Sequence, residues 1–213
     1  MTHPALPSDE EALKGFDVSR ETMDRLRILV TELRRWQSIK NLVGPGTLDA
    51  VWTRHIADSL QLLALVPDAP QTWLDLGSGA GFPGLVIAIA APSGSRVHLV
   101  ESNSRKCAFL RHAARATGAP TQVHEGRIED LVPSFAGQVD FVTARALAPL
   151  TQLLAWSEPV LSKGAIGLFL KGREASSELT EAQRSWRFHY EAIPSRTDSQ
   201  ARILRIADLA SQS

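Results

Sequence analysis

The spacing of hydrophobic residues along the chain changes near residue 70. Apolar side chains recur every three to four positions over residues 23–39, which predicts an amphipathic helix of about two dozen residues with Ser19 as its cap. A second helix is predicted over about 53–66, and Pro67 then breaks the pattern. We therefore expect an N-terminal helical extension over residues 1–70.

From residue 71 onward, short apolar runs alternate with helical segments. This alternation predicts an α/β unit over 71–213, with a mostly parallel sheet and helices on both of its faces. The tail differs, because 186–193 and 201–207 read as two strands joined by a turn. Such an antiparallel hairpin at the sheet edge would make the sheet mixed. The expected strands are 73–76, 97–100, 122–124, 141–143 and 166–170, and the expected helices are 83–90, 104–117, 128–131 and 150–156.

Composition narrows the class of protein. The chain has 213 residues, 44% of them hydrophobic, and its 23 basic residues balance 23 acidic ones. This excludes a disordered chain and a uniformly basic nucleic-acid binder, although a local basic patch remains open. Cys107 is the only cysteine, so an internal disulfide and a cysteine metal cluster are excluded. The longest apolar run, 85–91, is too short for a membrane span. We expect a cytoplasmic protein with no membrane partner and no metal.

A glycine-rich loop, WLDLGSGAGFPG over 73–84, joins the first predicted strand to a helix. In doubly wound sheets, ligands bind at the carboxyl ends of the strands, beside this first turn. Gly77, Gly79 and Gly81 carry no Cβ atom that would keep a ligand away from the backbone. The loop is therefore the principal candidate binding site.

Two classes of ligand fit the loop. Gly79 to Gly84 match the dinucleotide pattern G-x-G-x-x-G, and Glu101 follows Gly79 by 101 − 79 = 22 residues, where a ribose-binding acid is expected. An NAD(P)- or FAD-dependent oxidoreductase is therefore one alternative. However, Asp75 stands two residues before alternating glycines, and the chain is too short for a separate substrate domain. The loop resembles the first motif of class I S-adenosylmethionine (SAM) methyltransferases, Rossmann-like enzymes in which an acid at the second strand, here Glu101, holds the ribose.

The wider sequence is similar to the bacterial 16S rRNA methyltransferase G family, also called glucose-inhibited division protein B. The resemblance implies a SAM-dependent methyltransferase acting on N7 of guanine 527, in the 530 loop of 16S rRNA in the small ribosomal subunit. Two departures are modest: VGPG at 43–46 replaces a Thr-rich loop, and ARALA at 144–148 replaces SRAVA. The segments that carry the resemblance are Asn41-Leu42, WTRHIADSL at 52–60, LDLGSGAGFPG at 74–84, VESNSRK at 100–106 and TARALAPL at 143–150.

Residue roles follow in two groups. For the cofactor, the resemblance implies that Glu101 holds the ribose, and Asp75 is expected either to hold the loop or to reach the methionine amino group. The expected cofactor residues are Asp75, Gly77, Gly79, Gly81, Phe82, Glu101, Ile128, Glu129 and Arg145. The expected catalytic residues are Asn41 and Arg145. The resemblance implies Arg54, His55 and Ser59 as RNA-binding residues. Arg27 and Arg34 are further candidates, on a helix face that could instead be merely solvated. Lys171, at a strand end, is the last candidate, and a solvated charge is equally expected there.

The expected chemistry needs no general base, because guanine N7 already carries an exposed lone pair. The protein has only to align the reacting atoms and exclude water. His55, Asp58 and Ser59 lie within about one helical turn, so they do not form a hydrolase triad, whose members meet tip to tip in space. A non-catalytic small-subunit RNA-binding or assembly factor with a vestigial glycine loop remains the second alternative.

Overall fold

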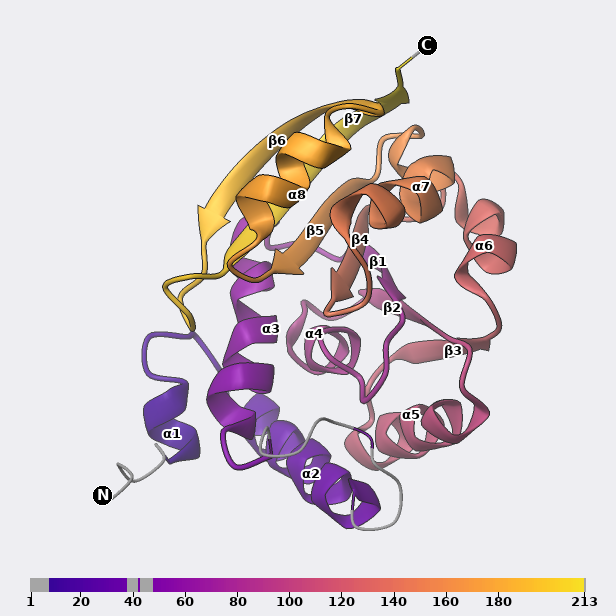
Figure 1. Ribbon diagram of the computed structural model, residues 1–213. Coiled ribbons are helices and arrows are strands. Elements are labelled where there is room, and N and C mark those ends of the chain that lie inside the picture. Colours follow the sequence, from indigo (N-terminus) through magenta and orange to yellow (C-terminus); the bar gives the residue numbers. More distant parts are fainter. Residues whose placement is uncertain (1–7, 38–41, 43–47, 213) are drawn as a thin grey trace.

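The structure is a computed structural model that describes residues 8–37, 42 and 48–212. A seven-stranded sheet crosses it in the order β3-β2-β1-β4-β5-β7-β6 (Figure 1). Strands β1 to β5 are parallel, whereas β7 is antiparallel to both β5 and β6. The expected mixed sheet with a C-terminal hairpin is therefore confirmed. The strands are β1 (Thr72–Leu76), β2 (Arg96–Glu101), β3 (Thr121–Glu125), β4 (Phe141–Arg145), β5 (Ile166–Lys171), β6 (Trp186–Pro194) and β7 (Arg202–Ser211).

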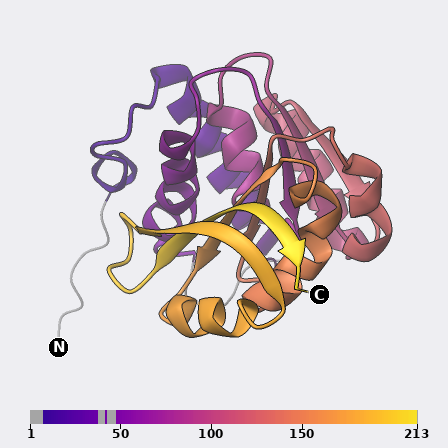
Figure 2. The ribbon, with the colours of Figure 1, turned by 90° about the horizontal axis from the view of Figure 1, so that it is seen from above.

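Helices cover both faces of the sheet, and two separate apolar cores result. Successive strand side chains point to opposite faces, so Trp73 packs in one core and Leu74 in the other. Figure 2 shows the violet N-terminal helices and the orange helices on opposite sides of the sheet. On the first face lie α2 (Arg20–Gln37), α4 (Gly84–Ala90) and α5 (Ser104–Thr117), and on the second lie α6 (Ile128–Leu131), the short η3 (Val132–Phe135), α7 (Leu150–Leu161) and α8 (Ala175–Ala182).

The N-terminal extension is helical, as expected. Ser19 caps α2 by accepting a hydrogen bond from the Thr22 N–H at 3.1 Å, and the buried leucines of α2 join the core shared with α4 and α5. The end of the predicted first helix lies outside the described residues. The remaining helical segments are α1 (Asp9–Ala12) and a continuous run of η1 (Trp52–Ala57), α3 (Asp58–Leu60) and η2 (Gln61–Leu65). Because the extension shares a core with the sheet, the boundary at residue 70 stays a prediction.

The order of strands places the candidate site. β1 lies between β2 and β4, so the chain crosses from one side of β1 to the other between β3 and β4. The carboxyl end of β1 therefore faces the crevice at which doubly wound sheets bind ligands. In the described part of the chain, no helix is long and apolar enough to cross a membrane.

Candidate functional site

The loop between β1 and α4 is held in a shape that requires glycine. Gly77 has φ +62°, and a Cβ atom there would lie 2.5 Å from Leu147 Cδ1. Gly81 has φ +89°, and its Cβ atom would lie 2.4 Å from Leu85 Cδ1. Other residues rarely adopt these backbone angles. The first glycine lets the β4–α7 loop approach, and the second lets the loop turn tightly into α4.

Glu101, the last residue of β2, ties this loop to the next one. Its Oε2 accepts a hydrogen bond from the Gly79 N–H at 2.9 Å, and its Oε1 accepts one from the Asn103 N–H at 2.8 Å. Asn103 in turn caps α5 through its side chain. Each carboxylate oxygen has a second lone pair, so Glu101 can still accept ribose hydroxyls. Its additional role as the tie between the two loops was not visible in the sequence.

A cleft of about 590 Å³ opens beside these loops. Of the nine residues expected to bind a cofactor, seven line it: Gly77, Gly79, Phe82, Glu101, Ile128, Glu129 and Arg145. They come from the carboxyl ends of β1, β2 and β4 and from the start of α6. The predicted site residues are thus largely gathered around one cavity.

Asp75 and Gly81 do not line the cleft, and their expected cofactor contacts stay predictions. Asp75 is 1% exposed beneath the loop, where its Oδ1 accepts a hydrogen bond from Thr143 Oγ1 at 2.8 Å. A Cβ atom at Gly84 would lie 2.7 Å from its Oδ2. Burial raises the pKa of Asp75 to about 6. The Asp75 side chain thus ties β1 to β4 through Thr143, while its Oδ2 has no hydrogen-bond partner among the described residues, so both roles that the sequence left open for it stay predictions.

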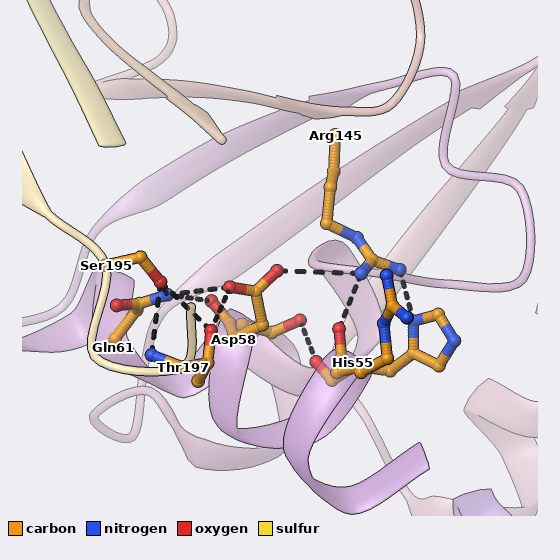
Figure 3. Close-up of polar contacts among 8 residues, drawn as sticks. His55, Asp58, Gln61, Arg145, Ser195 and Thr197 are labelled. Atoms are coloured by element: carbon orange, nitrogen blue, oxygen red, sulfur yellow. Dashed lines mark hydrogen bonds and ion pairs between the residues drawn. The ribbon is translucent and has the colours of Figure 1, made fainter. Parts of the chain in front are cut away.

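Arg145, at the end of β4, is the centre of a polar cluster (Figure 3). Its Nη1 donates a hydrogen bond to the Arg54 carbonyl at 2.7 Å, and its Nη2 donates to Nδ1 of His55. The guanidinium also lies 3.6 Å from Asp58 Oδ2 and over the Phe82 ring at 5.6 Å. Arg145 thereby joins β4 to the helical segment that precedes β1. Nothing local to residue 58 in the sequence indicated Arg145 as the partner of Asp58.

His55 is buried and uncharged in this cluster. Its ring stacks on Phe82 at 4.8 Å with an interplanar angle of 17°. Because Arg145 donates to Nδ1, the ring proton is assigned to Nε2. Burial, with the charges of Arg145 and Arg54, lowers the pKa of His55 to about 3. Nε2 is itself buried and has no hydrogen-bond partner among the described residues, so an unsatisfied N–H donor lies beneath the surface of the cleft.

A second cavity of about 520 Å³ adjoins the cleft. The two share Arg54, Arg145 and Ala146 as a common wall. Asp58 and Gln61 line the second cavity together with the turn between β6 and β7, to which they are hydrogen-bonded. Two ligands bound in the two cavities would therefore meet at Arg145.

Comparison with known proteins identifies the family. The model of a family described as rRNA small subunit methyltransferase G matches residues 22–203, which include the loop, Glu101, Asp58 and Arg145. The chain belongs to this family. The similarly named protein of Methylorubrum populi is 61% identical over 200 residues, 93% of this chain and 94% of that protein. The one from Methylobacterium radiotolerans is 58% identical over 208 residues, 97% and 98% of the two chains.

Solved structures support the fold. An O-methyltransferase from Bacillus cereus in complex with SAH matches with a TM-score of 0.60 and 13% identity, over 93% of this chain and 96% of that one. TomG, an O-methyltransferase from Streptomyces achromogenes in complex with SAM, also matches with a TM-score of 0.60 and 13% identity, over 92% and 93%. The expected class I SAM-dependent methyltransferase fold is confirmed. With the family, it makes the protein a methyltransferase, and the oxidoreductase and non-catalytic alternatives are not favoured.

The residues expected to face RNA in this methyltransferase G family member have different environments. Ser59 is 0% exposed, and its Oγ donates to the His55 carbonyl at 2.6 Å. It cannot touch RNA in this conformation, which corrects that expectation. The Lys171 side chain is 9% exposed and is paired with Glu178 at 2.5 Å. Its Nζ also donates to the Ala148 carbonyl, so Lys171 fixes α8 against the β4–α7 loop rather than offering a free cation.

The other RNA-side residues keep their candidacy to different degrees. Arg54 lines both cavities, whereas His55 is 6% exposed and lines only the cleft. Arg27 is already paired with Asp9 at 2.7 Å, while Arg34 is exposed on the last turns of α2. Asn41, the second expected catalytic residue, lies outside the described residues. In the described ranges, no group of three or more His, Cys, Asp or Glu side chains is placed to hold a metal ion.

The low pKa of His55 leads to a prediction about stability. Its folded value of about 3 lies below the ordinary value of 6.5, so the unfolded chain binds a proton first as the pH falls. This site therefore favours unfolding below pH 6.5. The free energy of unfolding, measured with urea, should fall between pH 7 and pH 5 in both proteins. We expect this fall to be about 1–2 kcal/mol smaller in the His55→Gln variant than in the wild type. His98 and His124, whose pKa values burial also lowers, contribute equally to both proteins. An identical pH dependence would contradict the neutral assignment.

Proposed function

We propose that this methyltransferase transfers the methyl group of SAM to N7 of guanine 527 in the 530 loop of 16S rRNA, within the small ribosomal subunit. The observation that carries this proposal is the pair of cavities joined at Arg145, one beside the glycine loop and one free for an acceptor. The relatives named ribosomal RNA small subunit methyltransferase G support the substrate class. With a ribosomal substrate, the proposed location of the protein is the cytoplasm.

The residues of the cleft fit SAM. Gly77, Gly79 and Phe82 border the cleft, and Glu101 keeps lone pairs for the ribose hydroxyls after it has bound the two loop amides. Ile128 and Glu129 form the wall proposed for the adenine. When bound, SAM supplies an electrophilic methyl group, which the N7 lone pair can take without loss of a proton. Catalysis then depends on alignment and exclusion of water.

This chain contributes positioning rather than acid–base chemistry. Arg145 is fixed by the Arg54 carbonyl and by His55, so its remaining N–H groups have a set direction at the junction of the cavities. His55 stays neutral, so it accepts from Arg145 through Nδ1 and adds no charge to the junction. Arg145 is proposed as a catalytic residue on this basis. The catalytic role of Asn41 stays a prediction.

Radiolabelled SAM tests the proposal directly. Purified protein and small subunits that lack methylation of guanine 527 are incubated together, and the label is located in 16S rRNA. We expect label at N7 of guanine 527 and nowhere else. SAM and its demethylated product should also raise the melting temperature, since ligands stabilise the state that they bind, whereas NAD should not. Label at another base, or no label at all, would contradict the proposed reaction.

Arg34 is proposed to contact rRNA near the cleft entrance. One turn further along α2, Gln37 Oε1 accepts a hydrogen bond from the Leu42 N–H, and Leu42 lines the cleft. We expect Arg34→Glu to weaken small-subunit binding about threefold to tenfold at low salt and to reduce the salt dependence of binding, with SAM affinity unchanged. Arg20→Glu, the same charge change at the opposite end of α2, is the control. Equal effects of the two variants would indicate a general charge effect.

A further inference from the structure

The second cavity holds a donor and an acceptor side by side. Asp58 Oδ1 accepts hydrogen bonds from Gln61 Nε2 and Thr197 Oγ1, both at 2.8 Å, which fix the carboxylate. The other oxygen, Oδ2, lies 3.6 Å from Nη1 of Arg145, which is longer than a hydrogen bond. Figure 3 shows Gln61 and Thr197 on one side of Asp58 and Arg145 on the other. Oδ2 is therefore held in place with accepting capacity to spare.

Both members of the pair are shielded but reachable. The side chains of Arg145 and Asp58 are 19% and 16% exposed, and both residues line the second cavity. Arg145 borders the cofactor cleft as well, whereas Asp58 does not. From the second cavity toward the cleft, a ligand would therefore meet first the acceptor Asp58 and then the donor Arg145 at the common wall.

That order is complementary to one purine base. On guanine, the O6 acceptor lies between N7 on one side and the N1–H and N2–H₂ donors on the other. Adenine has an N6 amino donor in place of O6 and a lone pair at N1, which is the reverse pattern. A base read by Arg145 at O6 and by Asp58 at N1–H would turn N7 toward the cleft.

We propose that Asp58 and Arg145 select the target guanine by its Watson–Crick edge, with Asp58 Oδ2 accepting from N1–H and N2–H₂ and Arg145 donating to O6. This proposal rests on the proposed function. Enzymes that act on a base taken out of its stack commonly read that edge. Gln61 and Thr197 act as positioning residues, because their side chains hold Asp58 Oδ1 and tie it to Ser195 of the β6–β7 turn.

The charge of Asp58 also favours the reaction. As the N7 lone pair forms the new C–N bond, the C–S bond breaks with its electron pair going to sulfur, and the positive charge passes from sulfur to the purine ring. No proton leaves. A carboxylate beside the purine stabilises that charge where it appears, so its interaction is stronger in the transition state than with the neutral base. A carboxylate beside the sulfur would have the opposite effect.

Substituted rRNA tests the proposal with the wild-type enzyme. Small subunits are reconstituted with guanine, inosine or adenine at position 527, and kcat/KM for methyl transfer is measured. Inosine keeps O6, N1–H and N7 but lacks the N2 amino group. We expect inosine to be about 10-fold poorer than guanine and adenine to be inactive. Equal rates with guanine and inosine would overturn the assignment of Asp58 to N2–H₂.

The Asp58→Asn variant completes the test, since its amide oxygen can still accept from Gln61 and Thr197. We expect kcat/KM on guanine subunits to fall about 10- to 100-fold, the guanine-to-inosine ratio to fall toward one, and SAM affinity by calorimetry to stay within about twofold. Asp68→Asn, at an exposed acid that lines neither cavity, is the matched control. An unchanged kcat/KM and base ratio would overturn the inference alone. No transfer by the wild type to guanine subunits would instead overturn the proposed function.

Discussion

Replacing Glu101 by alanine is expected to weaken SAM binding about 10- to 100-fold, measured by titration calorimetry. Two effects combine. The variant loses the proposed bonds to the ribose, and hydrogen bonds to a charged group contribute about 1.5–3 kcal/mol each. It also releases the Gly79 and Asn103 amides that the carboxylate holds at 2.9 and 2.8 Å. The loop that forms the cleft then loses its tie to β2.

A modified ligand separates these two effects. S-adenosylhomocysteine and its 2′,3′-dideoxy analogue are compared on the wild type and on Glu101→Ala. If Glu101 contacts the ribose hydroxyls, the wild type prefers the natural ligand and the variant does not. A preference that persists in the variant would limit Glu101 to holding the loops.

The neighbouring strand provides a matched control for Glu101. Glu125 ends β3 in register with Glu101, but it does not line the cleft and is paired with Arg111 at 3.0 Å. Glu125→Ala is therefore expected to leave SAM affinity unchanged. A similar loss in both variants would show that the charge of the strand ends, rather than the Glu101 contacts, determines binding.

The sequence predicted what depends on local pattern. Alternating apolar runs placed five parallel strands and the C-terminal hairpin, because a buried strand needs apolar residues at fixed spacing. The expected helices over 104–117 and 128–131 match α5 and α6 at both ends. In contrast, α8 (Ala175–Ala182) was not expected, since its buried face consists of two alanines and Leu179, which gives a weak apolar period. The glycine loop was recognised for a related reason: its conformation is encoded in adjacent residues.

The parts of the site that were missed depend on tertiary contacts. Asp58 and Arg145 are 145 − 58 = 87 residues apart, and only the packing of the η1–α3 segment against the end of β4 brings them together. No local signal records that meeting. Position on a helix or at a strand end also does not determine exposure. Ser59 was expected to face RNA, yet it lies on the buried side of its helix. Lys171 stands at a strand end, as expected of a site residue, but a glutamate of α8 neutralises it.

Arg145→Ala is expected to reduce methyl transfer more than about 100-fold and to lower the melting temperature by roughly 10 °C. The guanidinium satisfies the Arg54 carbonyl and Nδ1 of His55 and stands beside Asp58. Its removal leaves two acceptors without donors and a shielded carboxylate without a counter-charge. Unmet groups of this kind cost about 1–3 kcal/mol each. Thermal unfolding and the transfer assay measure the two effects.

In Arg145→Lys, the rate of methyl transfer and the melting temperature should lie between those of the wild type and Arg145→Ala. One ammonium group cannot span acceptors that the planar guanidinium reaches from two nitrogens. The loss of the Arg145 charge should also be visible in the NMR titration of His55. The Arg145 charge is one cause of the low pKa of His55, so the His55 ring in Arg145→Ala should titrate at a higher pH by NMR, while burial still holds its pKa below 6.5. Arg184→Ala, whose side chain is 71% exposed and paired with Glu181, should change stability by less than about 0.5 kcal/mol. A wild-type melting temperature and an unmoved His55 titration in Arg145→Ala would mean that Arg145 does not organise the junction of the two cavities.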